Sequence, residues 1–393
     1  MRDFEAFHEL PWHGSAAQRH RLSFVVGQCI DGAIELEQLR LTVAKRLASD
    51  VLEDAERVAV GHGVLSALPA SLMAQVHYEH GALNEAEAVI QKHFAAIRAC
   101  GTFEAAVRAY RVLARIAVCR NADSRAETLL REAEALGTRR GWPVLIAMSL
   151  YEQVRLAARG GRMEQALHLV GRLDRLTQTA CTGARPDVRR FHRWADARVS
   201  IEGGVSTQTV ALVRELHEEV LSRGDLYQGV RIALELAGSL QRLGDLEEAD
   251  RIFMGTLKLG SGAGLYQVFV DERELIAPLL ERAFERARRP GSPCRELLPC
   301  MGALVKKRQF EATQPPQERR PQSSESLSAR ESAVLRLVCR GLSNKRIALS
   351  LAIAPETVKA HVKRIFLKLE VCSRAQAVFR ATSLGLLSDA SGR

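Results

Sequence analysis

Apolar side chains recur at spacings of three and four residues along most of the chain, as expected for helices with one buried face. Within this pattern a turn residue is followed five positions later by a small residue, at Gly81/Ala86, Asn121/Ala126, Gly161/Ala166, Gly204/Thr209 and Gly244/Ala249. The intervals between the turn residues are 40, 40, 43 and 40 residues. A fixed period of this length predicts stacked helix pairs, because one pair cannot bury its apolar face alone.

The C-terminal segment predicts a second group of short helices. Ser328 and Glu331 form an S-x-x-E capping box, which satisfies free N–H groups in the first turn of a helix. Gly341 stands where that helix needs a left-handed cap, and Ser343 is placed to cap the next helix. The apolar positions expected to form the core of this segment are Val334, Leu335, Val338, Ile347, Ala348, Leu351, Val358, Val362, Ile365 and Leu369.

The third helix of this segment has a basic outward face. It begins at Pro355, a residue suited to the first helical position, and carries Ala360, Lys363 and Arg364 opposite its apolar stripe, with Lys359 at the edge. A basic face with a small residue suits the major groove, where the backbone must approach the base edges closely. Residues 327–387 hold eleven Lys or Arg against three Glu, a net charge of +8 that favours phosphate contacts. A solvated surface is the simpler alternative for a basic face of this kind.

Periodicity and composition divide the chain into four parts. Residues 1–60 form a helical region without clear boundaries, and residues 61–288 hold the repeated helix pairs. Residues 289–326, rich in Pro, Gln, Ser and Arg, predict a flexible linker. Residues 327–393 form the basic segment, whose fourth helix is predicted from a cap at Ser373 to near Leu384. The expected fold is all-α: a superhelical array of helix pairs followed by a four-helix domain.

Composition narrows the classes of protein. The chain has 393 residues and a formal net charge of +10, most of it in the basic segment, and only 5% of its residues are aromatic. No run of eighteen apolar residues is long enough to span a membrane, and the opening MRDFEAFHELPWHG lacks the pattern of a signal peptide. The eight cysteines form no C-x-x-C pair, which is typical of reduced thiols. A cytoplasmic location is therefore expected.

No catalytic or metal-binding pattern stands out. The sequence has no G-x-x-x-x-G-K-[ST] phosphate loop and no arguable Ser/His/Asp or Cys/His arrangement. The histidine pairs His8/His13 and His77/His80 lack a convincing set of further ligands. We therefore expect a protein that is not an enzyme and that holds neither a cofactor nor a metal.

Several motifs of the basic segment occur in a fixed order: LSARESAVLRLVCRG, LSNKRIA, TVKAHVKRIFLKL and SRAQAV. Together they closely resemble the LuxR-type helix-turn-helix family. The resemblance implies that the third helix is the recognition helix and that the fourth is the dimerisation surface. It implies contacts with base edges by Lys359, Ala360 and Lys363. It implies contacts with backbone phosphates by Thr357, His361, Arg364, Lys368, Asn344 and Lys345. Glu331, Leu335 and Gly341 match family positions that are better explained as structural.

Two positions depart from that family's pattern. Ala354 stands where many relatives have Ser, which removes a side-chain cap from the recognition helix at a cost of roughly 1 kcal/mol. Arg346 replaces the Glu often found three residues after the cap of the second helix, which removes an acceptor and adds a cation. Neither change alters the assignment.

The repeat units resemble tetratricopeptide repeats lengthened beyond their usual span, and GDLEEA is their most specific piece. The segment GLYQVFVDERELIAPLLERAFERA (Gly264–Ala287) resembles the closing segment of the large MalT-like branch of LuxR-type regulators. In that branch a superhelical repeat domain senses an inducer and controls a C-terminal DNA-binding domain. Another kind of α-helical array is the alternative to tetratricopeptide-like pairs.

The MalT-like branch also carries an N-terminal ATPase module, whose phosphate loop is missing from this sequence. Two explanations stay open: a compact regulator controlled by its repeats alone, or the C-terminal portion of a longer regulator. In the first case switching does not depend on nucleotide.

These features predict a transcription regulator that binds double-stranded DNA as a homodimer formed through the fourth C-terminal helix. A small-molecule inducer or a protein partner is expected in the repeat groove, RNA polymerase is a further candidate partner, and no membrane is involved. The alternative is an interaction or scaffold protein whose helix-turn-helix segment is vestigial or controlled by its partner. The operator, the effector and the sign of regulation are not specified by the sequence.

Overall fold

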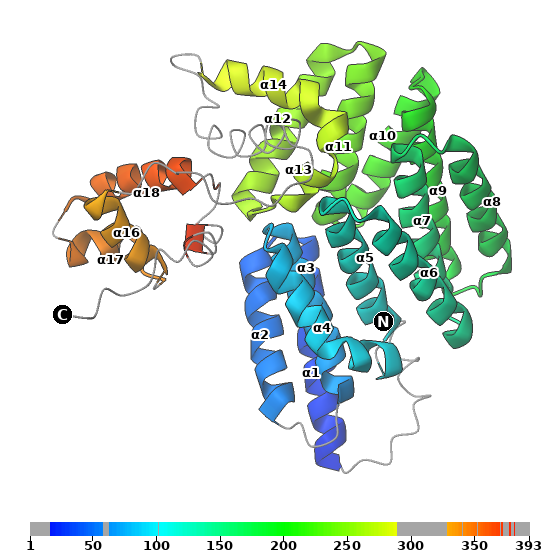
Figure 1. The fold of residues 1–393 in the computed structure, drawn as a ribbon, viewed down its shortest axis with the longest axis horizontal. Helices are drawn as coiled ribbons and strands as arrows, with labels where there is room; N and C mark the ends of the chain where they lie inside the picture. Colours follow the sequence, from blue (N-terminus) through cyan, green and yellow to red (C-terminus); the bar gives the residue numbers. More distant parts are fainter. Residues whose placement is uncertain are drawn as a thin grey trace.

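Helices and short connections make up all the described residues, and no strand occurs among them. The structure is a computed structural model that describes residues 16–57, 63–100, 102–288, 328–339, 341–351 and 353–369, with residues 371, 377, 378 and 381. The predicted all-α fold, an array of helix pairs followed by a helix-turn-helix domain, is confirmed (Figure 1). The predicted linker at 289–326 and most of the predicted fourth helix, with Ser373 and Leu384, lie outside the described residues.

The predicted turns of the repeat are present at every expected position. Each turn residue has a left-handed backbone conformation, with φ of 77° at Gly81, 57° at Asn121, 71° at Gly161, 129° at Gly204 and 97° at Gly244. Glycine and asparagine adopt this conformation at low cost, which explains their presence there. The small residue five positions later is buried in each case, at Ala86, Ala126, Ala166, Thr209 and Ala249. Because these side chains are short, the two helices of a pair pack closely.

The helices follow one another as antiparallel pairs from α1 to α12 (Figure 1). The first helices of the pairs are α1 (Ala16–Glu37), α3 (Gly63–Glu79), α5 (Phe103–Cys119), α7 (Pro143–Arg159), α9 (Arg185–Gly203) and α11 (Leu226–Leu243). The second helices are α2 (Leu41–Arg57), α4 (Leu83–Cys100), α6 (Asp123–Arg140), α8 (Met163–Thr179), α10 (Thr207–Ser222) and α12 (Leu246–Ala263). A short helix α13 (Gln267–Asp271) and the helix α14 (Arg273–Arg288) follow the last pair.

The two helices of a pair differ in how they are buried. The buried residues of α7 lie on almost every side of the helix, because α7 packs against α5, α6, α8 and α9. The buried residues of α8 form a single stripe of Ala166, Leu169 and Leu173. First helices therefore form a buried, mainly apolar layer between neighbouring pairs, and second helices cover it with an amphipathic face.

The end of the array returns to its beginning. The closing segment (Gly264–Ala287), which contains α13 and most of α14, packs beside α3. The backbone N–H of Tyr266 donates to the carbonyl oxygen of Glu79 at 2.8 Å. The hydroxyl of Tyr78 donates to Asp271 at 2.8 Å. A separate contact joins α1 to α11. Beside it the side-chain amide of Gln38, just after α1, donates to the carbonyl oxygen of Gly224, just before α11, at 2.6 Å. The array is thus fastened by contacts between residues far apart in the sequence.

The C-terminal helices α16 (Ala329–Cys339), α17 (Asn344–Ser350) and α18 (Pro355–Leu369) enclose a hydrophobic core of their own. The core contains the predicted Val334, Leu335, Val338, Ile347, Ala348, Val358, Ile365 and Leu369, with Leu351 and Val362 partly buried against it. The predicted caps are also confirmed. Ser328 and Glu331 exchange both bonds of a capping box, Ser343 accepts from the N–H of Arg346 at 3.4 Å, and Gly341 has a φ of 79°.

Replacing two of the turn glycines by alanine separates backbone strain from packing. Gly161→Ala forces a left-handed alanine into open space, whereas the new Cβ at Gly81 would lie 2.8 Å from the ring of Tyr266. We expect Gly161→Ala to lower the free energy of unfolding by about 1–2 kcal/mol. Gly81→Ala should cost clearly more, because Tyr266 has to move. Urea unfolding of the full chain measures both, and equal losses would contradict the contact between the turn and the closing segment.

Candidate nucleic-acid interface and the buried charge cluster

The exposed face of α18 carries the predicted base-contacting residues. Val358 and Ile365 are buried in the core of the domain, and this fixes the rotation of the helix. Lys359, Ala360 and Lys363 are exposed on the side that remains. The structure therefore brings the three predicted residues together on one surface, and their contact with bases stays a prediction.

Lys359 is paired with an acid of its own helix. Its ammonium nitrogen lies 2.7 Å from a carboxylate oxygen of Glu356, one turn earlier, and the two side chains are 61% and 79% exposed. Ion pairs this exposed contribute only about 0–1 kcal/mol, since water competes for both groups. The ammonium group of Lys359 is therefore able to change its partner at little cost.

The predicted phosphate-contacting residues occupy different environments. Thr357 and Arg364 are exposed on α18. His361 is half-buried, and its Nδ1 has no hydrogen-bond partner among the described residues. Asn344 is half-buried at the start of α17. The backbone of Lys345 follows in α17, while its side chain lies outside the described part of the structure. These residues lie on the two helices that the resemblance assigns to DNA, and their phosphate contacts stay predictions.

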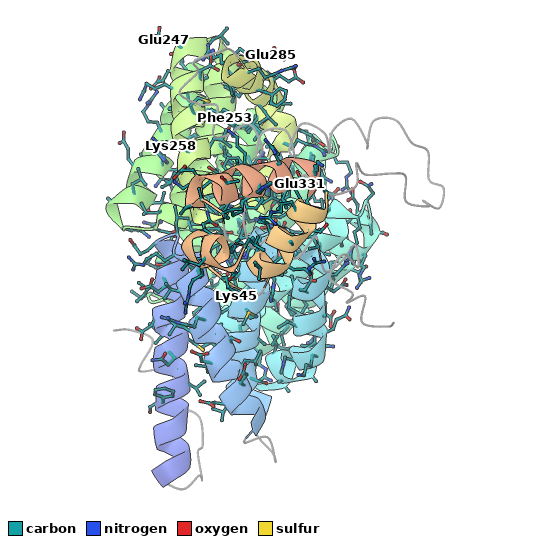
Figure 2. The ribbon with its side chains drawn as sticks, turned by 90° about the vertical axis from the view of Figure 1, so that its left-hand side faces the viewer. Lys45, Glu247, Phe253, Lys258, Glu285 and Glu331 are labelled. Atoms are coloured by element: carbon teal, nitrogen blue, oxygen red, sulfur yellow. The ribbon has the colours of Figure 1, made fainter. Side chains whose placement is uncertain are left out.

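Lys368, the last predicted phosphate contact, also links two helices. Its Nζ lies 2.8 Å from Oε2 of Glu331, which belongs to α16 (Figure 2 labels Glu331). The same oxygen accepts the backbone N–H of Ser328 at 2.8 Å. The bonds from Lys368 and then Ser328 lower the pKa of Glu331 to about 2, so the carboxylate stays charged at neutral pH. The structure therefore gives Lys368 and Glu331 a role in holding α18 against α16.

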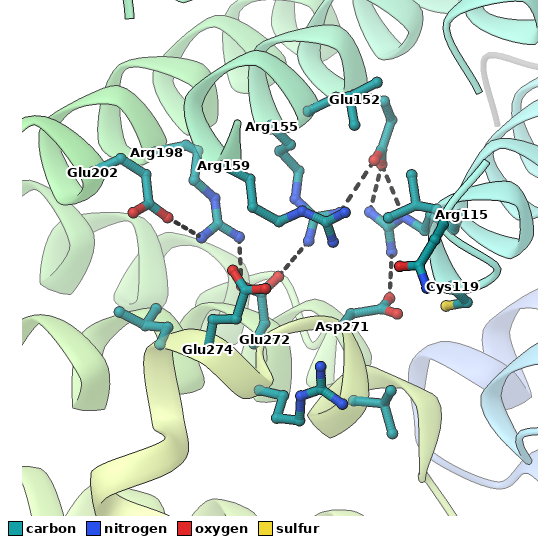
Figure 3. A pocket seen from close by; sticks show the side chains of 16 residues that line it. Arg115, Cys119, Glu152, Arg155, Arg159, Arg198, Glu202, Asp271, Glu272 and Glu274 are labelled. Carbon is teal, nitrogen blue, oxygen red and sulfur yellow. Dashed lines mark hydrogen bonds and ion pairs between the residues drawn. The ribbon is translucent and has the colours of Figure 1, made fainter. Parts of the chain in front are cut away.

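A second polar region lies inside the helix array, where arginines from three successive first helices meet the end of α13 (Figure 3). Arg115 of α5 donates to Glu152 at 3.0 Å and lies 3.5 Å from Asp271. Arg155 of α7 donates to Glu152 at 3.1 Å and also to Glu272. All of these side chains are buried or nearly so. Pairing within the cluster offsets the cost of removing the charges from water.

The cluster continues toward α11. Arg198 of α9 donates to Glu272 and lies 3.3 Å from Glu235. Arg231 of α11 is 7% exposed, and its Nη1 has no hydrogen-bond partner among the described residues. The hydroxyl of Tyr227 donates to Glu79 at 2.5 Å. This buried charge cluster therefore spans the array from α3 to α11.

The buried carboxylates respond to the arginines to different extents. Burial alone would raise the pKa of Glu152, but the guanidinium groups of Arg115 and Arg155 outweigh it and lower the pKa to about 2. The pKa of Glu272 is likewise held well below its usual range, because Arg198 and Arg155 outweigh burial. Burial raises the pKa of Glu79 to about 7 despite the bond from Tyr227. The cluster thus contains both firmly ionised carboxylates and one that titrates near neutral pH.

Comparison with known families accounts for both regions of the chain. Residues 325–381 match the luxR family of bacterial regulatory proteins, and residues 5–286 match the MalT-like TPR region. The chain belongs to the MalT-like TPR family. In this member of the family, a luxR-family domain follows the repeats.

Individual relatives of this MalT-like protein are named as regulators. The chain is 28% identical over 158 residues to the HTH-type transcriptional regulator AlkS of Ectopseudomonas oleovorans, covering 40% of this chain and 17% of AlkS. It is 26% identical over 224 residues to the HTH-type transcriptional regulator MalT of Serratia proteamaculans, covering 53% of this chain and 24% of MalT. A nitrate/nitrite response regulator homologue of Haemophilus influenzae is 51% identical over 53 residues, 14% of this chain and 26% of the relative. The chain therefore spans about a quarter or less of these relatives.

No helix within the described ranges is both long and apolar enough to cross a membrane. Among the same residues, no group of three or more His, Cys, Asp or Glu is arranged to hold a metal ion.

The buried charge cluster is absent from the expectations drawn from the sequence, although a signal for it exists. Arg115, Arg155 and Arg198 each lie six residues before a turn residue, so they occupy the same position in three successive pairs. An arginine that recurs at the same position of successive helix pairs is the sign that sequence reasoning overlooked. Asp271 and Glu272 carry no such sign, because only the return of the closing segment places them opposite the arginines.

Replacing Glu331 tests its link with Lys368. Glu331→Gln should destabilise the C-terminal domain by about 1.5–3 kcal/mol at neutral pH, since two hydrogen bonds to a charged group are weakened. The folded pKa of about 2 lies below the ordinary value of 4.5, so the stabilisation is complete above 4.5 and is lost as pH falls toward 2. Hydrogen exchange of peptides from 328–369 against urea, in the full chain, measures this local stability.

The matched control for this variant is Glu356→Gln, which breaks the exposed pair with Lys359. Its effect on stability should stay below about 0.5 kcal/mol at every pH. An equal response of the two variants would show that the Glu331–Lys368 bond does not hold the helices together.

Proposed function

We propose that this protein is a DNA-binding transcription regulator whose helix α18 reads the major groove. The observation that carries the proposal is the exposed row of Lys359, Ala360 and Lys363 on a helix fixed by its buried stripe. Lysine side chains donate to the O6 and N7 acceptors of guanine, and a small side chain permits close approach to the bases. The names of the relatives, which include HTH-type transcriptional regulators, support the same function.

On DNA the protein acts as a homodimer, with the fourth C-terminal helix as the contact between subunits. A two-fold dimer places two copies of α18 in successive major grooves on one side of the duplex. Its binding site then consists of two half-sites about one helical turn, roughly 34 Å, apart. Six residues contact the neighbouring phosphates and set the register of the protein on the DNA: Thr357, His361, Arg364, Asn344, Lys345 and Lys368. Such a regulator works in the cytoplasm, next to its DNA, with RNA polymerase as a further partner.

The helix array is the part that receives the signal. An inducer or a protein partner binds in the array and shifts an equilibrium between a state that masks the DNA-binding domain and one that leaves it free to dimerise. A ligand shifts such an equilibrium only by its different affinity for the two states. The alternative is an interaction protein whose array binds a partner and whose C-terminal domain is vestigial or controlled by that partner.

DNA binding by the intact protein and by residues 323–393 alone distinguishes these functions. Both are titrated at several salt concentrations with the DNA upstream of the protein's own gene. Specific binding that is weak in the intact chain and strong in the short piece is expected if the array masks the domain. Equal specific binding by both would contradict masking, and absence of specific binding by both would favour the interaction protein.

Two substitutions on α18 test the assignment of its surface. Lys363→Ala should cost about 1–3 kcal/mol on the specific site and little on unrelated DNA, because a base contact is lost. Arg364→Ala should weaken binding to all sequences and reduce the slope of log K against log salt by about 1. Lys258→Ala, an exposed lysine of α12 labelled in Figure 2, is the control and should change neither. Unaltered binding in both α18 variants would show that another surface meets DNA.

A further inference from the structure

We propose that the array binds a small anion, a carboxylate or a phosphate, on a row of buried arginines that the closing segment now occupies with its own acids. The arginine row consists of Arg115, Arg155 and Arg198. The inference rests on the proposed function of the array as the receiver of the signal, and it names the chemical class of the ligand.

The arginine row is a repeated feature of the array. Each arginine stands six residues before a turn, on α5, α7 and α9, and points into the same interior space (Figure 3). The equivalent positions in the flanking pairs are Gln75 and Gly238, which carry no charge. At Gly238 the side chain of Leu275 fills the space that a longer residue would need. The arginine row is therefore limited to the three central pairs.

The closing segment occupies the arginine row as a ligand would. Asp271 approaches Arg115 at 3.5 Å, and Glu272, the next residue, pairs with both Arg155 and Arg198. Two consecutive carboxylates thus engage the whole arginine row. Guanidinium groups recognise carboxylate and phosphate oxygens with the same paired donors, so either anion suits the same row.

Donor groups remain unused around the occupied row. The Nη1 atom of Arg231, which is 7% exposed, and the Nε atoms of Arg155 and Arg198 have no hydrogen-bond partners among the described residues. Buried polar groups in proteins are nearly always satisfied, and each exception calls for an explanation. An anion with more oxygens than the two side chains supply would use these donors.

A cavity of about 140 Å³ opens beside the occupied row and limits the size of the ligand. Its walls include Arg115, Arg155, Arg198, Asp271 and Glu272, together with Arg159. A cavity of about 150 Å³ holds a molecule the size of benzene, so the ligand has only a few heavy atoms. The cavity gives such an anion access to the arginines that the acidic pair now holds.

Displacement of the acidic pair would loosen the closure of the array. Asp271 also accepts a hydrogen bond from Tyr78 of α3, and Tyr266 of the same segment bonds to the backbone of Glu79. These contacts fasten the end of the array to its beginning. A bound anion therefore changes the part of the chain that leads, through residues 289–326, to the DNA-binding domain.

Calorimetric titration of the full chain tests the proposal with succinate and with inorganic phosphate, at constant ionic strength set by chloride. Succinamide, the neutral diamide of succinate, is the control ligand. Binding of either anion, without binding of succinamide, is expected. Binding of succinate alone would identify a carboxylate ligand and binding of phosphate alone a phosphate ligand.

Two variants are expected to act in opposite directions. Glu272→Gln weakens the internal competitor and should tighten anion binding about tenfold, whereas Arg155→Gln removes a donor and should weaken it about tenfold. Arg251→Gln, an exposed arginine of α12, is the matched control and should leave it unchanged. Thermal unfolding checks that each variant folds. If Arg155→Gln does not fold, Arg159→Gln, a partly exposed residue of the cavity wall, takes its place with the same expected direction.

Absence of anion binding by both the natural chain and Glu272→Gln would overturn the proposal. Binding that responds equally to Arg251→Gln and Arg155→Gln would overturn it too, because it would place the anion elsewhere. DNA binding with and without the anion is measured separately. Anion binding that leaves DNA affinity unchanged would support this site and contradict the proposed control of the DNA-binding domain, so the two failures are distinguishable.

Discussion

Stacking of helix pairs is the constraint on which the repeat domain depends. A single pair leaves one apolar face uncovered, and only the next pair covers it. The left-handed turns at Gly81, Asn121, Gly161, Gly204 and Gly244 and the small residues that follow them keep the helices of each pair close together. First helices such as α7 are consequently buried on almost every side. Any residue that the repeat places on the interior side of a first helix is removed from water.

This constraint explains why the interior charges are informative. Moving an ion from water into a protein costs several kcal/mol, and a buried ion pair is often no more stabilising than apolar residues of the same volume. Arg115, Arg155 and Arg198 nevertheless stand at the same position of three pairs, opposite Asp271 and Glu272. These arginines are therefore better explained by the specific pairing that they provide than by a gain in stability. The pairing makes the position of the closing segment depend on a few charged contacts, which a ligand of matching charge is able to replace.

The stability of the C-terminal domain depends on a few contacts, because its hydrophobic core is small. The buried residues of α16, α17 and α18 fix the rotation of α18 and thereby expose Lys359, Ala360 and Lys363. The bond between Lys368 and Glu331 joins the two ends of this unit. Lys368, which the family resemblance predicts to contact a DNA phosphate, thus has a structural role in the fold.

The sequence by itself determined the helix pairs, their period, the turns and the caps of the C-terminal domain, since each follows from local backbone preferences and from apolar spacing. It also determined the family and the exposed face of α18, because a buried stripe on one side of a helix defines the other side. Only the tertiary structure decided what meets across the array. Asp271 lies opposite Arg115, and Tyr227 meets Glu79, through contacts between residues more than a hundred positions apart. Such contacts depend on the total of the small rotations between successive helix pairs along the array. No local pattern of residues specifies this total.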